Sequence, residues 1–336
     1  MIRDHGGVLF LDLRDNTDTI QVVSNDDSMF RGIAKESVVK VTGTIRRRSE
    51  ETFNVKLHTG EKNGPNFVPS AWVKKVMEDE PSLKNAAIVE TNTYYVGDRD
   101  TTEKHLETLK VNGWDFCPVD IMDAEGTVRL PVKGGKWFTE MSHGKSMVNY
   151  DSMFVLTHFK GHTQGGFGGS NKNIGIGCAD GKVGKKWIHS REGEGQWSVR
   201  KEELMEKISE SSKATIDFFG KNITYVNVMR NMSVSCDCEG LAAAPVVTPN
   251  VGILASTDIC AIDTACVDLI YAMCEKDHHD LVERIETRHG HRQLSYMHEL
   301  GMGNSKYILI DLDNDEARIT PAKAVEGVKP FKLITK

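Results

Sequence analysis

Residues 149–184, NYDSMFVLTHFKGHTQGGFGGSNKNIGIGCADGKVG, form the stretch on which the predicted fold depends. The stretch begins with an apolar run at 153–156, which has the composition of a buried strand. It then becomes polar and carries nine glycines from Gly161 to Gly184. Glycine at this density costs chain entropy and is normally kept where the backbone needs positive φ or a close approach. We therefore predict a buried strand that leads into a ligand-binding loop.

Cationic and titratable side chains accompany this glycine loop, residues 161–177. His158, His162 and Lys172 are the candidate catalytic groups, because imidazole titrates near neutral pH and lysine carries a positive charge. Successive backbone N–H groups of such a loop can also form an anion-binding nest. We predict that a small anion binds here, and the expected contacts are Lys160, Gly165, Gly166, Gly168, Gly169, Asn173 and, from another strand end, Glu90. A mobile surface loop is the alternative, and the spacing fits neither the P-loop nor the dinucleotide fingerprint.

The composition narrows the class of protein. The 336 residues are 39% hydrophobic and 27% charged, which is typical of a globular protein. The net charge of −6 does not favour a general nucleic-acid surface. The sequence has no apolar run long enough for a membrane span, so we expect a cytoplasmic protein without a membrane partner. The seven cysteines indicate thiols or metal ligands rather than disulfides.

Apolar runs and amphipathic segments alternate along most of the chain. Strands are predicted near 53–57, 86–89, 153–156, 223–229 and 251–255, with helices beginning at 70, 100, 201 and 256 between them. This alternation predicts an α/β fold with a mostly parallel sheet and helices on both faces. Polar clusters at 90–95, 158–162 and 231–239 follow three of these strands. Ligands in open α/β sheets bind beyond the carboxyl ends of the strands, so we expect the three clusters to converge there.

The cysteines at 236 and 238 form the second candidate site. In extended backbone, a spacing of two residues directs both thiols to the same side. Thiolates favour soft metals, so Cys236 and Cys238 could hold zinc, copper(I) or an iron–sulfur cluster. Cys178, just past the glycine loop, is the predicted third ligand, and the fourth is another cysteine, His162, His189 or an external group. Two free thiols in a turn are the alternative.

The N-terminal segment carries strand patterns of its own. RDHGGVLFLDLRDNTDTIQVV (3–23) and VVKVTGTIRRR (38–48) resemble the anticodon-binding OB domain of bacterial-type aspartyl-tRNA synthetases over about the first 50 residues. By motif position, the resemblance implies that Arg3, Phe10 and Gln21 contact tRNA anticodon bases. An aromatic ring stacks on a splayed base and an amide reads its edge. The domain is expected to be truncated, because the strand that precedes this motif in the family is missing, and so is the synthetase catalytic domain.

A longer resemblance covers residues 53–313. ETNTYYVGDRDTTEKHL (90–106), the glycine stretch, CDCEGL (236–241) and VGILASTDICAIDTACVDL (251–269) resemble the family of uncharacterised Fe–S centre proteins, which is built on a domain of unknown function. The resemblance implies an intracellular α/β protein with an iron–sulfur or other metal role. Many relatives add a ferredoxin-like module that carries cluster cysteines, and this chain lacks one.

Together these features predict a chimeric chain of three parts. They are a partial OB-like β segment (1–52), an α/β domain (53–313) and a weakly structured tail (314–336). The predicted function is that of a metal- or iron–sulfur-associated protein that binds a small anionic molecule at the glycine loop. The more specific prediction is that this protein is an oxidoreductase. Two alternatives stay open. One is binding of a tRNA anticodon through the OB-like segment, and the other is a phosphate-ligand enzyme without a metal.

Overall fold

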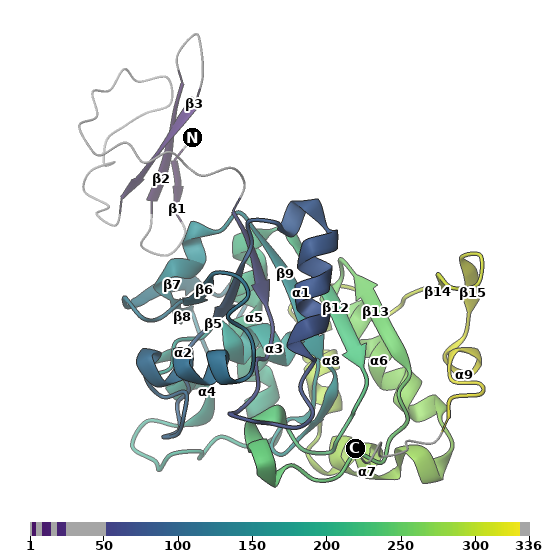
Figure 1. The fold of residues 1–336 in the computed structure, drawn as a ribbon. Helices are drawn as coiled ribbons and strands as arrows, with labels where there is room; N and C mark the ends of the chain where they lie inside the picture. Colours follow the sequence, from purple (N-terminus) through teal and green to yellow (C-terminus); the bar gives the residue numbers. More distant parts are fainter. Residues whose placement is uncertain (1, 5–8, 15–18, 25–51, 330–336) are drawn as a thin grey trace.

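The computed structural model describes residues 2–4, 9–14, 19–24 and 52–329. Its centre is a six-stranded sheet in the order β13 (Gly252–Ser256), β12 (Ile223–Met229), β9 (Ser152–His158), β4 (Phe53–Lys56), β5 (Ala87–Glu90) and β6 (Val119–Ile121). Five of these strands are parallel, and β13 pairs antiparallel with β12 at one edge (Figure 1). The predicted α/β fold with a mostly parallel sheet is therefore confirmed.

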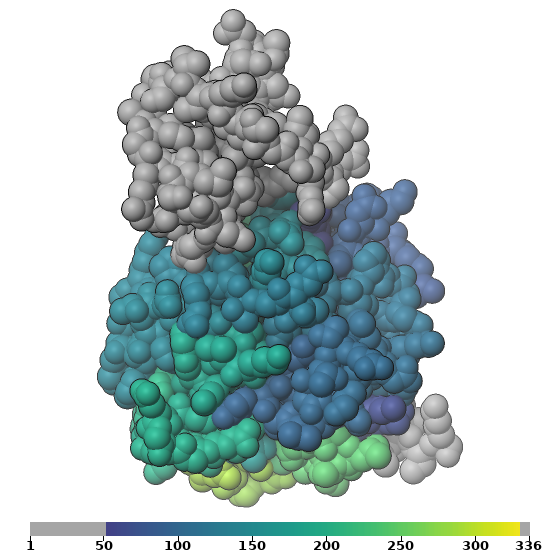
Figure 2. All heavy atoms as spheres, turned by 90° about the vertical axis from the view of Figure 1, so that its left-hand side faces the viewer, coloured from purple at the N-terminus to yellow at the C-terminus, as the bar shows by residue number. Residues whose placement is uncertain are grey.

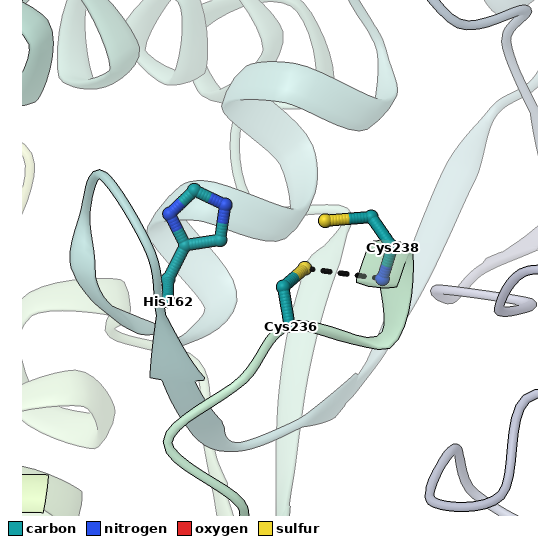
Figure 3. Close-up of side chains that lie close together, drawn as sticks. All are labelled: His162, Cys236 and Cys238. Carbon is teal, nitrogen blue, oxygen red and sulfur yellow. Dashed lines mark hydrogen bonds between the residues drawn. The ribbon is translucent and has the colours of Figure 1, made fainter. Parts of the chain in front are cut away.

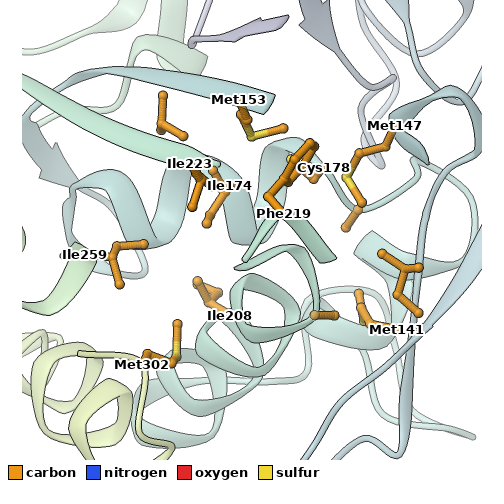
Figure 4. Packing of buried hydrophobic residues seen from close by; sticks show 14 of the residues in the cluster. Met141, Met147, Met153, Ile174, Cys178, Ile208, Phe219, Ile223, Ile259 and Met302 are labelled. Carbon is orange, nitrogen blue, oxygen red and sulfur yellow. The ribbon is translucent and has the colours of Figure 1, made fainter. Parts of the chain in front are cut away.

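Helices cover both faces of this sheet because successive residues of a buried strand point to opposite faces. On β9, Val155 packs on one face and Leu156 on the other. The face with Leu156 is covered by α1 (Ser70–Asp79) and α2 (Thr102–Val111). The face with Val155 is covered by α3 (Ser170–Gly177), α5 (Lys201–Phe219) and α6 (Ile259–Ala272). Figure 4 shows part of the packing of this second face, where Ile174 of α3, Ile208 of α5 and Met153 of β9 belong to one cluster.

The remaining elements surround this core. After β9, the short strands β10 (Lys160–His162) and β11 (Gly166–Gly168) form a hairpin that leads into α3. A second hairpin consists of β7 (Thr127–Pro131) and β8 (Glu140–Gly144), and a third of β14 (Leu309–Asp311) and β15 (Ala317–Ile319). The other helices are α4 (Gly184–His189), α7 (Glu275–Thr287), α8 (His291–Glu299), α9 (Pro321–Ala324) and the 3-10 helices η2 (Pro81–Leu83), η3 (Lys145–Asn149) and η4 (Asp237–Ala242).

Several element boundaries follow local chemistry that the sequence displays. The helix predicted from residue 201 is α5, and it ends at Gly220, whose φ of 59° suits glycine. Asp258 caps α6 by accepting the backbone N–H of Ala261. The cap of α2 is Thr101, one residue after the predicted Asp100. The tail was expected to be weakly structured, but β15 and α9 both lie beyond residue 314.

The N-terminal segment forms an antiparallel three-stranded sheet of β1 (Ile2–Asp4), β2 (Leu9–Arg14) and β3 (Thr19–Ser24). The register pairs Arg3 with Phe10 and Asp12 with Gln21. Because residues two apart share a face, Arg3, Phe10 and Gln21 belong to the same face of this sheet. The strand pattern at 38–48 lies outside the described residues. Among the described helices, none is both long and apolar enough to span a membrane.

Candidate functional site

A cavity of about 460 Å³ lies where the parallel strands end. His58 follows β4, Glu90 ends β5, His162 belongs to the hairpin after β9, and Cys238 follows β12, and all four border the cavity. The carboxyl ends of parallel strands meet at one edge of the sheet, so segments far apart in sequence come together there. The predicted convergence of the polar clusters is therefore confirmed.

Positive charge dominates the cavity wall. Five cationic side chains line it, against one carboxylate, that of Glu90; the cations are Lys56, Arg99, Lys172, Lys185 and Arg200. Two of the cations are already neutralised. Lys56 forms a 2.8 Å ion pair with Glu90, and Arg99 pairs with Glu61, which lies outside the lining. The cavity therefore retains a surplus of positive charge when empty of ligand.

Lys172 is the clearest source of this surplus. It comes from the first turns of α3 and is 9% exposed, and it borders the cavity. Within residues 52–329, no hydrogen bond or ion pair engages its ammonium group, although its charge also lowers the pKa of the Cys236 thiol. A buried charge without a hydrogen-bonding partner is costly, because burial removes its hydration. An anion in the cavity would supply the missing partner.

Lys185 and Glu90 hold the cavity wall in shape. The ammonium of Lys185 donates to the hydroxyl of Thr91 at 2.7 Å and to the carbonyls of Thr91 and Asn92. Burial lowers the pKa of Lys185 to about 8, although the nearby carboxylates oppose this shift. Burial opposes ionisation of Glu90 too, but the positive groups around it, with Lys56 first, together outweigh burial and hold the pKa of Glu90 well below its usual range.

The turn that carries the two cysteines is fixed by Asp237 between them. Its carboxylate faces His158 Nδ1 at 2.9 Å and Lys160 Nζ at 3.2 Å, and all three side chains are buried. Burial opposes ionisation of Asp237, but these two partners hold its pKa well below the ordinary value. His158 also bonds the carbonyl of Arg230 at 2.7 Å through Nε2. Neither His158 nor Lys160 borders the cavity, so the predicted acid–base and anion-binding residues act here as supports of the turn.

Beside this turn lies a compact thiol–imidazole cluster. Ligand atoms of His162, Cys236 and Cys238 lie within 4.8 Å of one another, and Figure 3 shows the ring and both sulfur atoms directed into the same space. The sulfur of Cys236 accepts the backbone N–H of Cys238 at 3.4 Å. A hydrogen bond from the Cys238 thiol lowers the pKa of Cys236 well below its ordinary value, burial opposes this, and the charge of Lys172 adds to it. Cys236 is thus the thiolate of the pair.

Two histidines direct N–H groups towards that thiolate. His162 Nδ1 accepts the backbone N–H of Gly165 at 2.8 Å, and His58 Nδ1 accepts that of Gly60 at 3.1 Å. A backbone N–H can only donate, so the proton of each neutral ring is on Nε2. Nε2 of His58 lies 3.9 Å from Cys236 Sγ, and a ring nitrogen of His162 lies within 4.8 Å of this sulfur. His58 therefore stabilises the thiolate by donating to it, and His162 lies beside it.

The ligand atoms of this cluster suit a single soft metal ion better than an iron–sulfur cluster. The Cys/His cluster could hold a metal ion, and its two sulfur atoms suit a soft one. An iron–sulfur cluster normally needs four protein ligands, usually thiolates. The other five cysteines lie elsewhere in the fold: Cys117, Cys178, Cys260, Cys266 and Cys274. Among the described residues, this place offers two cysteines and one histidine.

Cys178, the predicted third ligand, belongs to the hydrophobic core. It is fully buried among Met147, Met153 and Phe219, as Figure 4 shows, and burial raises the pKa of its thiol to about 11. The position that the sequence assigned to it in the cluster is taken by His162.

The glycines of the loop serve close packing. A Cβ on Gly169 would lie 2.4 Å from the carboxylate of Asp263, and one on Gly161 would lie 2.4 Å from the carbonyl of Val234. Gly166 has a φ of 77° and lies against the backbone of Gly290. The predicted anion contacts Gly165, Gly166, Gly168 and Gly169 do not border the cavity, whereas Asn173, Lys172 and Glu90 do.

Sequence reasoning missed several residues of this site, among them His58, Lys185 and Trp197. His58 and Lys185 are isolated in sequence from the cysteines, and Trp197 lies after α4, whereas His189 was predicted, but as a metal ligand. The motifs HTGE (58–61) and KKWIHS (185–190) offered a weak signal. It was weak because a histidine or lysine amid small polar residues is common in loops. Their role depends on contacts between distant segments.

Comparison with known proteins divides the chain into two parts. Residues 1–61 match the model of the OB-fold nucleic acid binding domain. The aspartate–tRNA(Asp/Asn) ligase of Trichodesmium erythraeum is 52% identical over 65 residues, which are 18% of this chain and 11% of the ligase. That of Thermobifida fusca is 49% identical over 59 residues, 18% of this chain and 10% of the ligase. The chain thus spans about a tenth of the length of these curated relatives.

A solved structure of the lactate racemase apoprotein from Thermoanaerobacterium thermosaccharolyticum aligns with a TM-score of 0.36 and 15% identity. The alignment covers 56% of this chain and 45% of the racemase, and at this TM-score it carries no inference.

The comparison with family models assigns the larger part of the chain to a family. Residues 54–268, which contain the sheet, the cavity and the cysteine turn, match the model described as a domain of unknown function (DUF362). Since this match covers more than half of the 336 residues, the chain belongs to the DUF362 family.

Proposed function

We propose that the DUF362 domain binds a small anionic metabolite in the cavity at the carboxyl ends of the parallel strands. The observation that carries the proposal is Lys172, which is 9% exposed and borders the cavity with its ammonium unpaired among the described residues. Lys185 and the exposed residue Arg200 add positive charge around it. A carboxylate or phosphate group would offset the cost of burying this charge.

The test is isothermal titration calorimetry with inorganic phosphate and with succinate as probes. We expect saturable binding of at least one probe, and a loss of about tenfold in affinity in Lys172→Met, which corresponds to about 1.4 kcal/mol. Lys186→Met is the matched control, since Lys186 is exposed on the same short helix as Lys185. The proposal is wrong if neither probe binds the unaltered protein, or if Lys172→Met binds like Lys186→Met.

We further propose that Cys236 and Cys238 hold a soft metal ion at the wall of this cavity. The support is the cluster of two sulfur atoms and the ring of His162, whose ligand atoms lie within 4.8 Å of one another, with Nε2 of His58 3.9 Å from Cys236 Sγ. Such outer hydrogen bonds orient metal ligands and tune them. Two thiolates leave other coordination positions for the bound metabolite. An oxidoreductase is the enzyme class that such a site would serve, provided the metal is iron or copper rather than zinc.

Cobalt(II) titration tests this metal site, because thiolate ligation gives an intense charge-transfer absorption. We expect the absorption in the unaltered protein and its loss in Cys236→Ser and Cys238→Ser. Cys274→Ser is the control, since Cys274 is exposed and outside the cluster. Anion binding that survives a chelator, together with absent cobalt absorption, would instead support a phosphate-ligand protein without a metal.

A second candidate function belongs to the N-terminal segment. The OB-fold model and the ligase identities cover it, and its register assigns Arg3, Phe10 and Gln21 to one face of the sheet. We propose that this face binds a tRNA anticodon loop. Binding of a labelled tRNA-Asp anticodon stem–loop should fall with rising salt and weaken by about tenfold in Phe10→Ala. Absence of binding at low salt would end the proposal.

A further inference from the structure

An aromatic wall stands beside the cationic part of the cavity. Tyr94, Tyr95, His189 and Trp197 all border it. The ring of Trp197 lies 5.4 Å from that of Tyr94, 6.4 Å from that of Tyr95 and 4.7 Å from that of His189, measured between centroids. Figure 2 shows the segment around residue 95, in blue, next to the segment around residue 195, in teal-green. Flat rings are therefore gathered at one side of a site whose charge is positive.

Trp197 reaches this position through an uncommon backbone conformation. Its φ is 66°, in the left-handed region that bulky residues seldom adopt. The hydroxyl of Ser190 accepts its backbone N–H at 3.2 Å and also contacts the hydroxyl of Tyr94 at 3.2 Å. Strained residues of this kind persist only when their surroundings hold them, and they cluster at ligand sites. The strained backbone of Trp197 thus coincides with an indole ring that borders the cavity.

His189 joins the aromatic wall to the cations. It is 7% exposed, and its Nδ1 has no hydrogen-bond partner among the described residues. Burial lowers the pKa of His189 well below its ordinary value, and the charges of Lys172, Lys185 and Arg200 lower it further. The ring is therefore neutral beside three cations. The neutral ring of His189 therefore extends the aromatic wall beside Trp197.

We infer that the metabolite is an aromatic anion, with its planar ring against Trp197 and Tyr94 and its anionic group at Lys172. The inference rests on the proposed anion-binding function and names the class of ligand. The cavity of about 460 Å³ falls within the usual range for small-molecule sites, roughly 300–1,000 Å³. An aryl carboxylate and an aryl phosphate share this chemistry.

The test compares phenyl phosphate, cyclohexyl phosphate and inorganic phosphate by calorimetry on the full chain. The first two differ in ring planarity and π character at equal charge and similar size. We expect phenyl phosphate to bind about fivefold more tightly than cyclohexyl phosphate, because ring stacking adds to apolar contact. Benzoate against cyclohexanecarboxylate repeats the comparison for the carboxylate source.

Substitutions at Trp197 test whether this residue causes the preference for phenyl phosphate over cyclohexyl phosphate. Trp197→Leu should abolish the preference for phenyl phosphate and leave the affinity for inorganic phosphate unchanged, whereas Trp197→Phe should keep most of it. Trp72→Leu is the control, since Trp72 is exposed on α1 and does not border the cavity. Thermal denaturation of each variant confirms that it is folded.

The outcomes separate the two proposals. If phenyl and cyclohexyl phosphate bind equally, or if Trp197→Leu keeps the preference, the aromatic inference is wrong, while Lys172-dependent binding of inorganic phosphate would still support anion binding. If none of the probes binds, both proposals fail.

Discussion

At the scale of single residues, the site depends on which buried charges have partners. Glu90 was predicted to contact the ligand, yet its carboxylate is occupied by Lys56 and by the backbone N–H and hydroxyl of Thr59. Among the described residues, Lys172 has no such partner, and it is the better candidate for the ligand contact. Two charged residues at one cavity thus differ in role, because one is satisfied by the protein and the other is not.

Replacing Glu90 by glutamine should destabilise the fold by about 3–5 kcal/mol at pH 7, because Lys56 would remain buried without its counter-charge. The folded-state pKa of Glu90 lies below its ordinary value of 4.5, so its stabilising contribution is complete above pH 4.5 and is lost as the pH falls. The stability difference between the unaltered protein and Glu90→Gln should therefore shrink in acid. Urea denaturation at pH 7 and pH 4 measures it.

Asp79→Asn is the control for this substitution. Asp79 pairs with Lys75 on the exposed side of α1, where ion pairs contribute about 0–1 kcal/mol. Two results would contradict the assignment of Glu90 to a buried structural pair. One is a Glu90→Gln variant that is no less stable than Asp79→Asn, and the other is a loss of folding stability in Glu90→Gln that grows in acid.

At the scale of elements, the glycine loop matters through the helix that follows it. Asp263 of α6 accepts the backbone N–H groups of Ser170 and Asn171 at the start of α3, and the side chain of Asn227 from β12. The carboxylate satisfies N–H groups that the first turn of a helix leaves free. Gly169 makes this approach possible because it has no side chain. The loop therefore fixes α3, and α3 carries Lys172 into the cavity.

Gly169→Ala should destabilise the protein by about 1–3 kcal/mol, since the added Cβ would lie 2.4 Å from the carboxylate of Asp263. Gly195→Ala is the control, because a Cβ there would meet nothing within 4 Å. Thermal denaturation followed by circular dichroism compares the two. Equal melting temperatures for both variants would show that the loop tolerates a side chain at Gly169, and that close packing is not the reason for glycine there.

At the scale of the whole molecule, the parallel sheet assembles the site. Every residue that lines the cavity lies between Lys56 and Cys238, inside the segment from 54 to 268 that matches the family model. The OB-fold match covers residues 1–61 and so overlaps the domain only at its start. Metabolite binding and nucleic-acid binding are therefore expected to separate along the chain.

A fragment of residues 52–336 should bind inorganic phosphate with the affinity of the full chain, because it contains β4 and all of the lining residues. The same fragment should lose any binding of the anticodon stem–loop. Calorimetry and fluorescence anisotropy on the fragment and on the full chain make the comparison. A folded fragment that no longer binds phosphate would show that the N-terminal segment contributes to the cavity.

Much of the fold could be predicted because its signals are local. The alternation of apolar runs with amphipathic segments indicated the α/β class, and α5 begins and ends where its pattern does, at Lys201 and before Gly220. The convergence of the strand ends followed from the topology of a parallel sheet. β15 and α9 were missed because short elements carry little periodicity.

By itself, the sequence determined the fold class, the strand ends at which a site forms, and the pair of cysteines two residues apart. Only the tertiary structure decided the roles. It paired Lys160 and His158 with Asp237, packed Cys178 in the core, and brought His58 and His162 to the sulfur of Cys236. It also left Lys172 unpaired at the cavity. The reason is physical: secondary structure follows periods of two to four residues, whereas burial and charge pairing depend on neighbours that lie up to 178 positions apart.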